Sequence, residues 1–184
     1  MEKIRVWTKQ HKIVWEILDR EGVYHALRAP IKAKAETDFI GPIYDWLAKN
    51  SPTAKEKPAG ADYPIWLAFS REGTMLPTPD TVLIELEIDP AMITHINIAK
   101  WGTILNCSYI SIDEADALRH RRLLADYNTT DVRACTTEFF PQIRREIHDS
   151  WLRLFDPDIQ VGSPECYNTI WEVKKEWVRN VETP

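Results

Sequence analysis

The chain has few glycines and no long apolar run, and each shortage excludes a class of protein. Its six glycines form no Gly-x-Gly-x-x-Gly fingerprint, no Walker loop and no Gly-x-Ser-x-Gly elbow. The common dinucleotide, triphosphate and hydrolase signatures are therefore absent. No stretch approaches the roughly 20 apolar residues of a membrane span, and the N-terminus lacks the apolar segment of a signal peptide. These absences predict a cytoplasmic protein without a membrane partner.

Cysteine and histidine are also sparse. The three cysteines are widely separated and include no Cys-x-x-Cys pair, which favours a reduced cytoplasmic protein with unpaired thiols. Cys107 and Cys135 have no histidine nearby in sequence, so buried thiols are favoured over nucleophiles. The five histidines show no ligand spacing with each other or with cysteine. No metal is expected.

Tryptophan, in contrast, is abundant, with eight copies in 184 residues. The chain is otherwise ordinary for a soluble globular protein, with 44% hydrophobic and 28% charged residues. Its length suits a single domain over residues 1–184, and its net charge of -5 argues against non-specific coating of nucleic acid. Eight tryptophan side chains predict either a hydrophobic core rich in aromatic rings or an aromatic pocket for a flat ligand. For any one of them, packing in the core is favoured.

The N-terminal part predicts a strand followed by a helix. Alternation over Ile4–Thr8 indicates a short strand, and Thr8 can cap a helix with an apolar stripe over residues 13–18. Gly22 then ends this helix, and a second short strand follows over Val23–Leu27. A second helix is expected from about Thr37 or Pro42 through Asn50.

The remaining elements alternate without a regular period. We expect a loop over Ser51–Asp62, strands over Tyr63–Ser70 and Thr81–Asp89, a helix from the Ser111 capping box to about Leu124, a helix over Pro141–Leu154, a strand over Tyr167–Val173 and a polar tail. This order predicts an α+β fold, a single domain with a mixed, mainly antiparallel sheet flanked by helices.

Two charged patterns are candidates for chemistry. Glu85 and Glu87 share one face of a predicted strand, where a solvated sheet face is favoured over acid–base work. Two basic sets lie on predicted helices, and they keep RNA or DNA binding open as a function although solvent-exposed helix surfaces are favoured. These sets are Arg119, His120, Arg121 and Arg122, and Arg144, Arg145, His148 and Arg153.

Around the tryptophans the chain resembles a bacterial and phage family known as domain of unknown function 3841. The resemblance depends on the order and spacing of short phrases over nearly the whole chain. These phrases are Val6-Trp7-Thr8, Glu21-Gly22-Val23, Arg28, Tyr44-Asp45-Trp46, Tyr63-Pro64-Ile65-Trp66, residues 82–88, Trp101 with Leu105-Asn106 and Tyr109, residues 150–156, and Thr169-Ile170-Trp171-Glu172.

The order of elements also resembles, more distantly, small ADP-ribosyltransferase-like domains. That resemblance implies an ADP-ribosyltransferase-like fold with NAD as the candidate ligand, held near Trp7 and Thr8. It implies that Arg28 meets the diphosphate and that Glu172, or Glu165 in the preceding loop, is the carboxylate that orients the ribose. Tyr44, Trp66 and Asn106 complete the predicted ligand-binding set.

Three functions follow as hypotheses. The first is an ADP-ribosyltransferase-like, nucleotide-binding protein that uses Arg28 and Glu172. The second is a non-enzymatic interaction protein of phage or mobile-element origin that inhibits a host or defence protein; it is favoured by the acidic composition and by departures from the family at polar positions such as Ala29 and Asn168. The third is an RNA- or DNA-binding module that uses the two basic sets.

Overall fold

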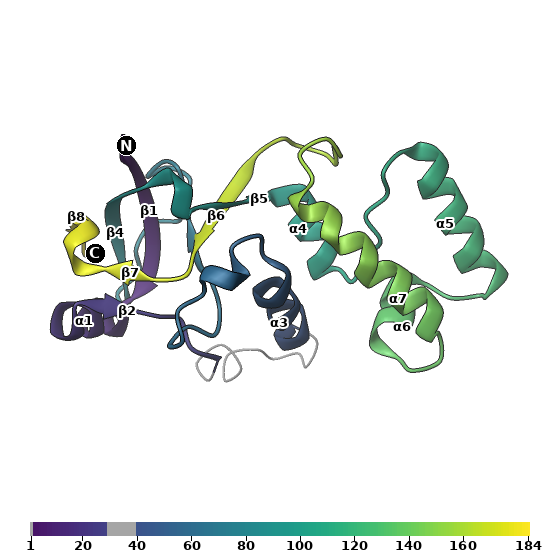
Figure 1. Cartoon of the computed structure of the whole chain (residues 1–184), viewed down its shortest axis with the longest axis horizontal. Coiled ribbons are helices and arrows are strands. Elements are labelled where there is room, and N and C mark those ends of the chain that lie inside the picture. The colour runs from purple at the N-terminus through teal and green to yellow at the C-terminus, as the bar shows by residue number, and fades with distance from the viewer. Residues whose placement is uncertain (1, 29–39) are drawn as a thin grey trace. The chain divides into compact units, whose positions relative to one another are not determined.

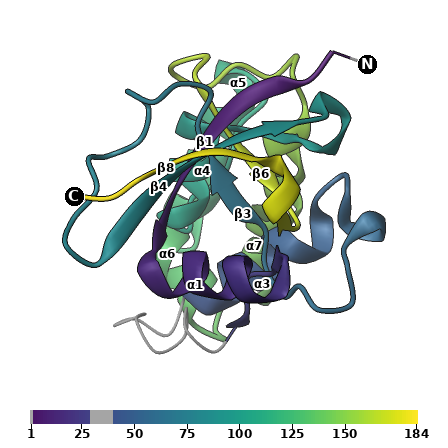
Figure 2. The ribbon, with the colours of Figure 1, turned by 90° about the vertical axis from the view of Figure 1, so that its left-hand side faces the viewer.

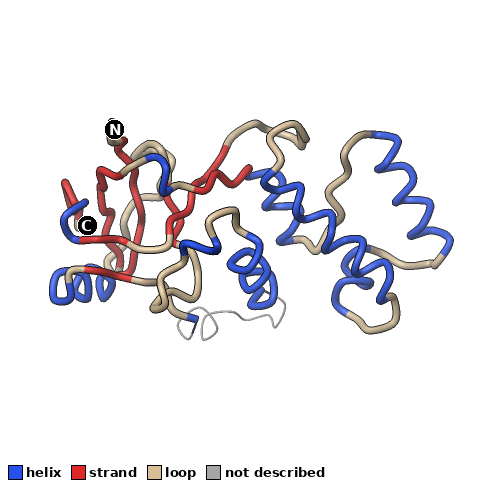
Figure 3. The backbone as a smooth tube through the Cα atoms, viewed as in Figure 1, coloured by secondary structure: helices blue, strands red, loops and turns tan. Residues whose placement is uncertain are grey.

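A computed structural model describes residues 2–28 and 40–184. By internal contacts the chain divides into two compact units. The first consists of Met1–Glu36, Tyr44–His95 and Tyr167–Pro184, and the second of Thr37–Ile43 and Ile96–Cys166. Strands dominate the first unit and helices the second (Figure 3). The expectation of one domain over residues 1–184 stays a prediction.

The strands make three small sheets, with strand orders β1-β4-β8, β2-β7 and β3-β6-β5. Antiparallel pairing joins β1 to β4, β4 to β8, β2 to β7 and β3 to β6. The predicted α+β class with antiparallel pairing is confirmed. The strands are β1 (Ile4–His11), β2 (Val23–Tyr24), β3 (Ile65–Leu67), β4 (Thr81–Ile88), β5 (Thr94–Asn97), β6 (Cys166–Ile170), β7 (Val173–Lys174) and β8 (Val178–Glu182).

The α-helices and short 3-10 helices connect these strands (Figure 1). The α-helices are α1 (Lys12–Glu21), α3 (Ile40–Asn50), α4 (Ile98–Leu105), α5 (Glu114–Asp126), α6 (Asp131–Thr136) and α7 (Pro141–Ser150). The 3-10 helices are η1 (Ala54–Glu56), η2 (Pro90–Met92), η3 (Trp151–Phe155) and η4 (Lys175–Trp177). Among the described helices, none has both the length and the apolar character that a membrane span requires.

The centre of the first unit is β4, which pairs with β1 along one edge and with β8 along the other (Figure 2). Its even-numbered residues Val82, Ile84, Leu86 and Ile88 are all buried, as the alternation predicts. Glu85 and Glu87 on the other face form ion pairs with Arg5 and Arg179. The glutamates therefore lie in a charged outer face of the sheet.

Helix α1 ends as the sequence predicts, but it begins later than expected. Gly22 adopts the left-handed conformation, with φ of 78°, and its amide donates to the Leu18 carbonyl. The expectation that Thr8 caps the helix is wrong, because β1 continues to His11 to complete its pairing with β4. His11 is the N-cap, and its imidazole accepts a hydrogen bond from the Ile13 amide.

Two other boundaries differ from the sequence prediction. Asp113 rather than Ser111 caps α5, because its carboxylate accepts from the Asp116 amide. The expected polar tail instead forms η4 and β8, and Trp177 within it is buried. Strand β8 buries no continuous stripe of apolar side chains, so its sequence shows little of the alternation of apolar and polar residues that predicts a strand. Its pairing with β4 is what makes it a strand.

The second unit buries the apolar faces of α4 and α7 together with η3. Its core includes Ile104, Ile147 and Trp151, and the Trp151 indole donates to the Ser108 carbonyl at 3.0 Å. Lys100 is also buried, and its ammonium donates to the carbonyls of Arg153 and Asp156 at 2.9 and 2.6 Å. Because these carbonyls end η3, the lysine fixes the C-terminal turn of that helix.

Candidate functional site

The predicted ligand-binding pair on β1, Trp7 and Thr8, lies against β3 in the first unit. The Trp7 backbone exchanges hydrogen bonds with Ala68 at 2.9 and 2.8 Å. Thr8 is buried, and its hydroxyl donates to the Trp66 carbonyl at 2.8 Å and lies 2.7 Å from the Gln10 amide nitrogen. The hydroxyl proton of Thr8 is therefore used to hold β1 to β3.

Arg28 lies in a cluster of polar and aromatic side chains. Its guanidinium Nη2 donates to Oδ1 of Asp45 at 2.5 Å, and the Tyr63 hydroxyl donates to the same oxygen at 2.7 Å. The guanidinium also lies over the Tyr63 ring, 5.9 Å from its centroid. The backbone amide of Arg28 donates to Asp62 at 2.8 Å, which fixes the chain where it leaves β2.

The tyrosine of this cluster is held in its neutral form. Burial of Tyr63, its hydrogen bond to Asp45 and the charge of Asp45 raise its pKa to about 12. The hydroxyl is therefore a hydrogen-bond donor at neutral pH. This donor, together with Arg28, fixes the direction of the Asp45 carboxylate.

Tyr44 and Trp66 join the same region through Tyr63. The Tyr44 ring meets the Tyr63 ring edge-on, with centroids 5.7 Å apart, and the Tyr44 side chain shares a hydrogen bond with Trp66. Burial raises the pKa of Tyr44, although the bond to Trp66 opposes this shift. The first unit thus connects Thr8, Trp66, Tyr44 and Arg28 by direct contacts through Tyr63 and Asp45.

Glu172 lies between β6 and β7, and both of its carboxylate oxygens have cationic or imidazole partners. Oε2 is 3.2 Å from Nε2 of His25, and Oε1 is 3.2 Å from the Lys174 ammonium. His25 packs closely on Gly60, where an added Cβ would lie 3.1 Å from the imidazole. The carboxylate is only 18% exposed, so these partners fix its position.

The pairing of β2 with β7 places the segment that leads to Arg28 beside the segment that contains Glu172. Val23 and Tyr24 pair with Lys174 and Val173, and the next residue, His25, reaches Glu172. Ala26 then bridges to Tyr63, whose ring lies under Arg28. We call this set, Arg28, Asp45, Tyr63, His25 and Glu172, the Arg28–Glu172 cluster. Sequence analysis missed Asp45, Tyr63 and His25 as members, although the first two lie in the phrases that carry the family resemblance.

Asn106 lies in the second unit, as does the alternative carboxylate Glu165. The Asn106 side-chain amide donates to the Gly102 carbonyl at 2.7 Å and is the C-cap of α4. Glu165 is exposed, and its backbone carbonyl accepts from the Ile98 amide at 3.0 Å. Their predicted roles at a ligand stay predictions.

The second unit contains a charged network that sequence analysis missed. His120 is 4% exposed, and its ring nitrogens lie 2.7 Å from Asp131 and 3.0 Å from Glu146. Its ring stacks on Tyr109, with centroids 4.0 Å apart and planes within 10°. Burial alone would lower the pKa of His120, but the hydrogen bonds to Asp131 and Glu146 outweigh burial and raise it.

Two arginines extend this network. Arg119 donates to Asp116 and Glu146 at 2.9 and 2.8 Å, and Arg153 donates to Asp116 at 3.0 Å and to the Ile110 carbonyl. Burial opposes ionisation of Asp116, but the Ile112 amide, Arg119, Tyr109 and Arg153 outweigh it and lower the pKa to about 2. A signal was available in sequence, because Asp116, His120 and Leu123 share one helical stripe.

The basic sets are therefore largely engaged within the chain. Besides Arg119 and Arg153, Arg144 forms an ion pair with Glu138 at 2.6 Å. Arg121, Arg122 and Arg145 are exposed and have no ion-pair partner among the residues that the structure describes. Nucleic-acid binding through these arginines stays a prediction, with fewer unpaired charges than the sequence suggests.

Cys135 has a histidine neighbour that the sequence did not indicate. Its sulfur lies 3.4 Å from Nε2 of His148, and it also shares a hydrogen bond with Cys107. Burial and the neighbouring Cys107 raise the pKa of Cys135 to about 12, and burial lowers the pKa of His148. Both shifts favour the neutral thiol and imidazole, whereas a cysteine nucleophile needs the thiolate. In residues 2–28 and 40–184, no group of three or more His, Cys, Asp and Glu side chains could hold a metal ion.

A comparison of the chain with models of known protein families finds a match. No curated protein and no solved structure matches the chain. A family model described as a domain of unknown function (DUF3841) matches residues 5–179, which include most of β1, the Arg28–Glu172 cluster and the His120 network. The match covers nearly the whole chain, and the phrases around the tryptophans lie within it. The chain therefore belongs to the DUF3841 family.

Proposed function

We propose that the chain is an ADP-ribosyltransferase-like protein that binds NAD at the Arg28–Glu172 cluster. The observation that carries this proposal is the antiparallel pairing of β2 with β7. It brings His25 into contact with Glu172, and Arg28 follows His25 by three residues. The arginine and the carboxylate therefore come from segments that are distant in sequence but paired in the fold.

Arg28 supplies the phosphate-binding group. Its guanidinium is 48% exposed, and Asp45 uses only Nη2 among its nitrogen donors. A guanidinium carries five N–H donors in a planar fork that suits paired phosphate oxygens. Among residues 2–28 and 40–184, no side chain other than Asp45 accepts a hydrogen bond from this guanidinium. We propose that its remaining donors bind a diphosphate, while Asp45 and the Tyr63 ring hold the group in place.

Glu172 supplies the carboxylate that orients a ribose hydroxyl. His25 and Lys174 hold its two oxygens, so the carboxylate is ready before the ligand arrives. Preorganised hydrogen-bonding groups are effective in catalysis because they need no reorganisation during the reaction. Tyr44, which packs against Tyr63, and Trp66, which is hydrogen-bonded to Tyr44, supply aromatic surface for a flat ring of the ligand.

Titration calorimetry with NAD tests this proposal. We expect saturable binding, a loss of roughly tenfold or more in affinity for Arg28→Gln, and little change in affinity for Glu172→Gln. Transfer of label from labelled NAD to lysate components should require Glu172. The matched control is Arg20→Gln, an exposed arginine that, within the part of the chain that the structure describes, pairs only with the neighbouring Glu21. Absence of NAD binding together with absence of label transfer would refute the proposal.

A second candidate function is inhibition of a host or defence protein by direct binding. Met75 and Leu76, in the connection between β3 and β4, are 77% and 73% exposed, and adjacent exposed apolar side chains favour a protein contact. A tagged chain should recover a stoichiometric partner from host lysate, and Met75→Ser with Leu76→Ser should lose it. Equal recovery by the double variant would exclude this surface.

A further inference from the structure

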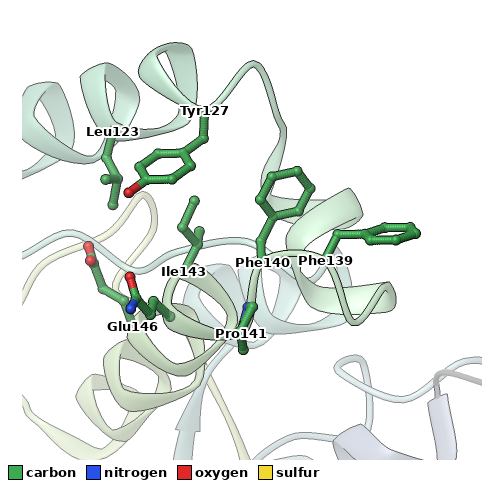
Figure 4. A pocket seen from close by; sticks show the side chains of 8 residues that line it. Leu123, Tyr127, Phe139, Phe140, Pro141, Ile143 and Glu146 are labelled. Atoms are coloured by element: carbon green, nitrogen blue, oxygen red, sulfur yellow. The ribbon is translucent and has the colours of Figure 1, made fainter.

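The second unit contains a pocket that the proposed function does not use. It lies between α5 and the N-terminal end of α7 and has a volume of about 350 Å³. Tyr127, the residue that follows α5, reaches into it, and Ile143 and Glu146 reach into it from α7 (Figure 4). Pockets for small molecules have volumes of about 300–1,000 Å³, so this one lies at the lower end of the range.

The walls of the pocket are mainly apolar and aromatic. Its apolar and aromatic lining residues are Leu123, Tyr127, Phe139, Phe140, Pro141 and Ile143. The guanidinium of Arg133 lies over the Phe140 ring, 5.5 Å from its centroid, and this contact helps to hold the ring in place. Aromatic walls of this kind suit a flat aromatic ring, and the volume is sufficient for two fused rings.

Glu146 is the one carboxylate among the described residues that line the pocket, and its position is fixed. Its Oε1 accepts from Arg119 at 2.8 Å and from His120 at 3.0 Å. Burial would raise the pKa of Glu146, but these two partners outweigh burial and lower it, so the group is ionised at neutral pH. Its Oε2 receives no hydrogen bond from the described residues. A carboxylate oxygen at the wall of an apolar pocket needs a hydrogen-bond donor when a ligand covers it.

The network behind Glu146 determines the charge that the ligand carries. Three carboxylates and three cationic groups balance when the imidazole is protonated, namely Asp116, Asp131 and Glu146 against Arg119, Arg153 and His120. The pocket therefore presents no excess negative charge that would demand a cation. A neutral N–H donor satisfies Oε2.

We propose that this pocket binds a flat aromatic heterocycle of about two fused rings that donates one N–H group to Oε2 of Glu146. The rings fill the space between Tyr127, Phe140 and Ile143, and the carboxylate sets their orientation. This site lies entirely within the second unit and is independent of the Arg28–Glu172 cluster.

The sharpest test compares two probes of nearly equal shape on the unaltered chain. Indole carries the N–H donor and benzofuran has an oxygen in its place. In ligand-observed NMR titrations we expect indole to bind at least roughly tenfold more tightly, because a hydrogen bond to a charged acceptor is lost with benzofuran. Equal affinities, or no saturable binding of indole, would overturn the proposal.

Two variants locate the site. Glu146→Met should remove the preference for indole over benzofuran, and Leu123→Trp should fill the pocket and abolish binding of both probes. Leu118→Trp is the matched control, because Leu118 is on the same helix, is 42% exposed and does not line the pocket. Arg28→Gln should leave indole binding unchanged, which separates this proposal from the NAD site. If concentration-dependent dimerisation blocked indole and Leu123→Trp abolished the dimer, a second copy would be the occupant and the proposal would be wrong.

Discussion

His120 is a buried imidazole with a carboxylate at each ring nitrogen. A neutral imidazole has one donor and one acceptor nitrogen, so one of the two contacts would be repulsive. The protonated ring donates to both carboxylates and removes this conflict. The contacts therefore connect α5 to α6 and to α7 through a single charged side chain.

Replacement of His120 should destabilise the chain strongly. His120→Asn leaves Asp131 and Glu146 without their shared cation, and we expect a loss of roughly 2–3 kcal/mol in the free energy of unfolding. The control is Arg121→Asn at the next, exposed position, with a change within about 0.5 kcal/mol. Urea denaturation measures both, and similar losses for the two variants would contradict the network.

The same contacts predict how stability depends on pH. The pKa of His120 is raised in the folded state by Asp131 and Glu146, beside Arg119 and Tyr109. Its stabilising contribution is therefore complete below the ordinary pKa of 6.5 and is lost as the pH rises through the raised value. Urea midpoints from pH 6 to pH 9 should fall in the native chain more than in His120→Asn. Parallel curves would show that His120 does not titrate in this range.

Cysteine reactivity gives a further test at single residues. The pKa of Cys135 is raised to about 12 by burial and by Cys107, whereas Cys166 is exposed. Because alkylation requires the thiolate, iodoacetamide at pH 8 should label Cys166 in the folded chain and leave Cys135 and Cys107 unmodified. Peptide mass spectrometry follows the sites, with urea-unfolded chain as the control in which all three react.

At the scale of elements, Gly22 and Gly102 have different backbone conformations, and their substitution by alanine should change stability in opposite directions. Gly22 ends α1 in the left-handed conformation, with φ of 78°. Gly102 lies within α4, where an added Cβ would meet no atom within 4 Å. We expect Gly22→Ala to destabilise the chain by about 1 kcal/mol and Gly102→Ala to stabilise it by about 0.5–1 kcal/mol. Thermal or urea unfolding gives the sign of each change, and equal signs would contradict the assigned conformations.

Local signals in the sequence were sufficient for several elements. The alternation over Thr81–Ile88 predicts β4, and Gly22 predicts the end of α1, because both depend on residues that are neighbours in the chain. The caps at His11 and Asp113 were missed for a physical reason. Several residues that could act as an N-cap lie near the start of each of these two helices. For α1, the pairing of β1 with β4 decides where the helix can begin.

At the scale of the whole molecule, the C-terminal segment completes the sheet of the first unit. Strand β8 covers one edge of β4, Trp177 is buried, and Arg71 pairs with Glu182. An uncovered β4 edge would present unpaired backbone groups to solvent. The tail is therefore part of the fold.

Truncation tests this contribution. A chain ending at Glu176 loses Trp177 and β8, and we expect a loss of at least about 3 kcal/mol in stability with faster hydrogen exchange at β4. A chain ending at Glu182 keeps both features and should behave as the full chain. Unchanged protection of the β4 amides in the shorter chain would show that β8 is dispensable.

The sequence by itself determined the α+β class, the family and the main local elements, because hydrophobic periodicity, turn residues and ordered tryptophan phrases are properties of adjacent residues. It also indicated Arg28 and Glu172 through resemblance. Only the tertiary structure decided which side chains surround them, because His25, Asp45 and Tyr63 meet through strand pairing and helix packing. In the sequence, His120 is one member of a run of basic residues. Tertiary packing buries it and pairs its ring with Asp131 and Glu146, because burial and ion-pair partners depend on segments that are distant in sequence.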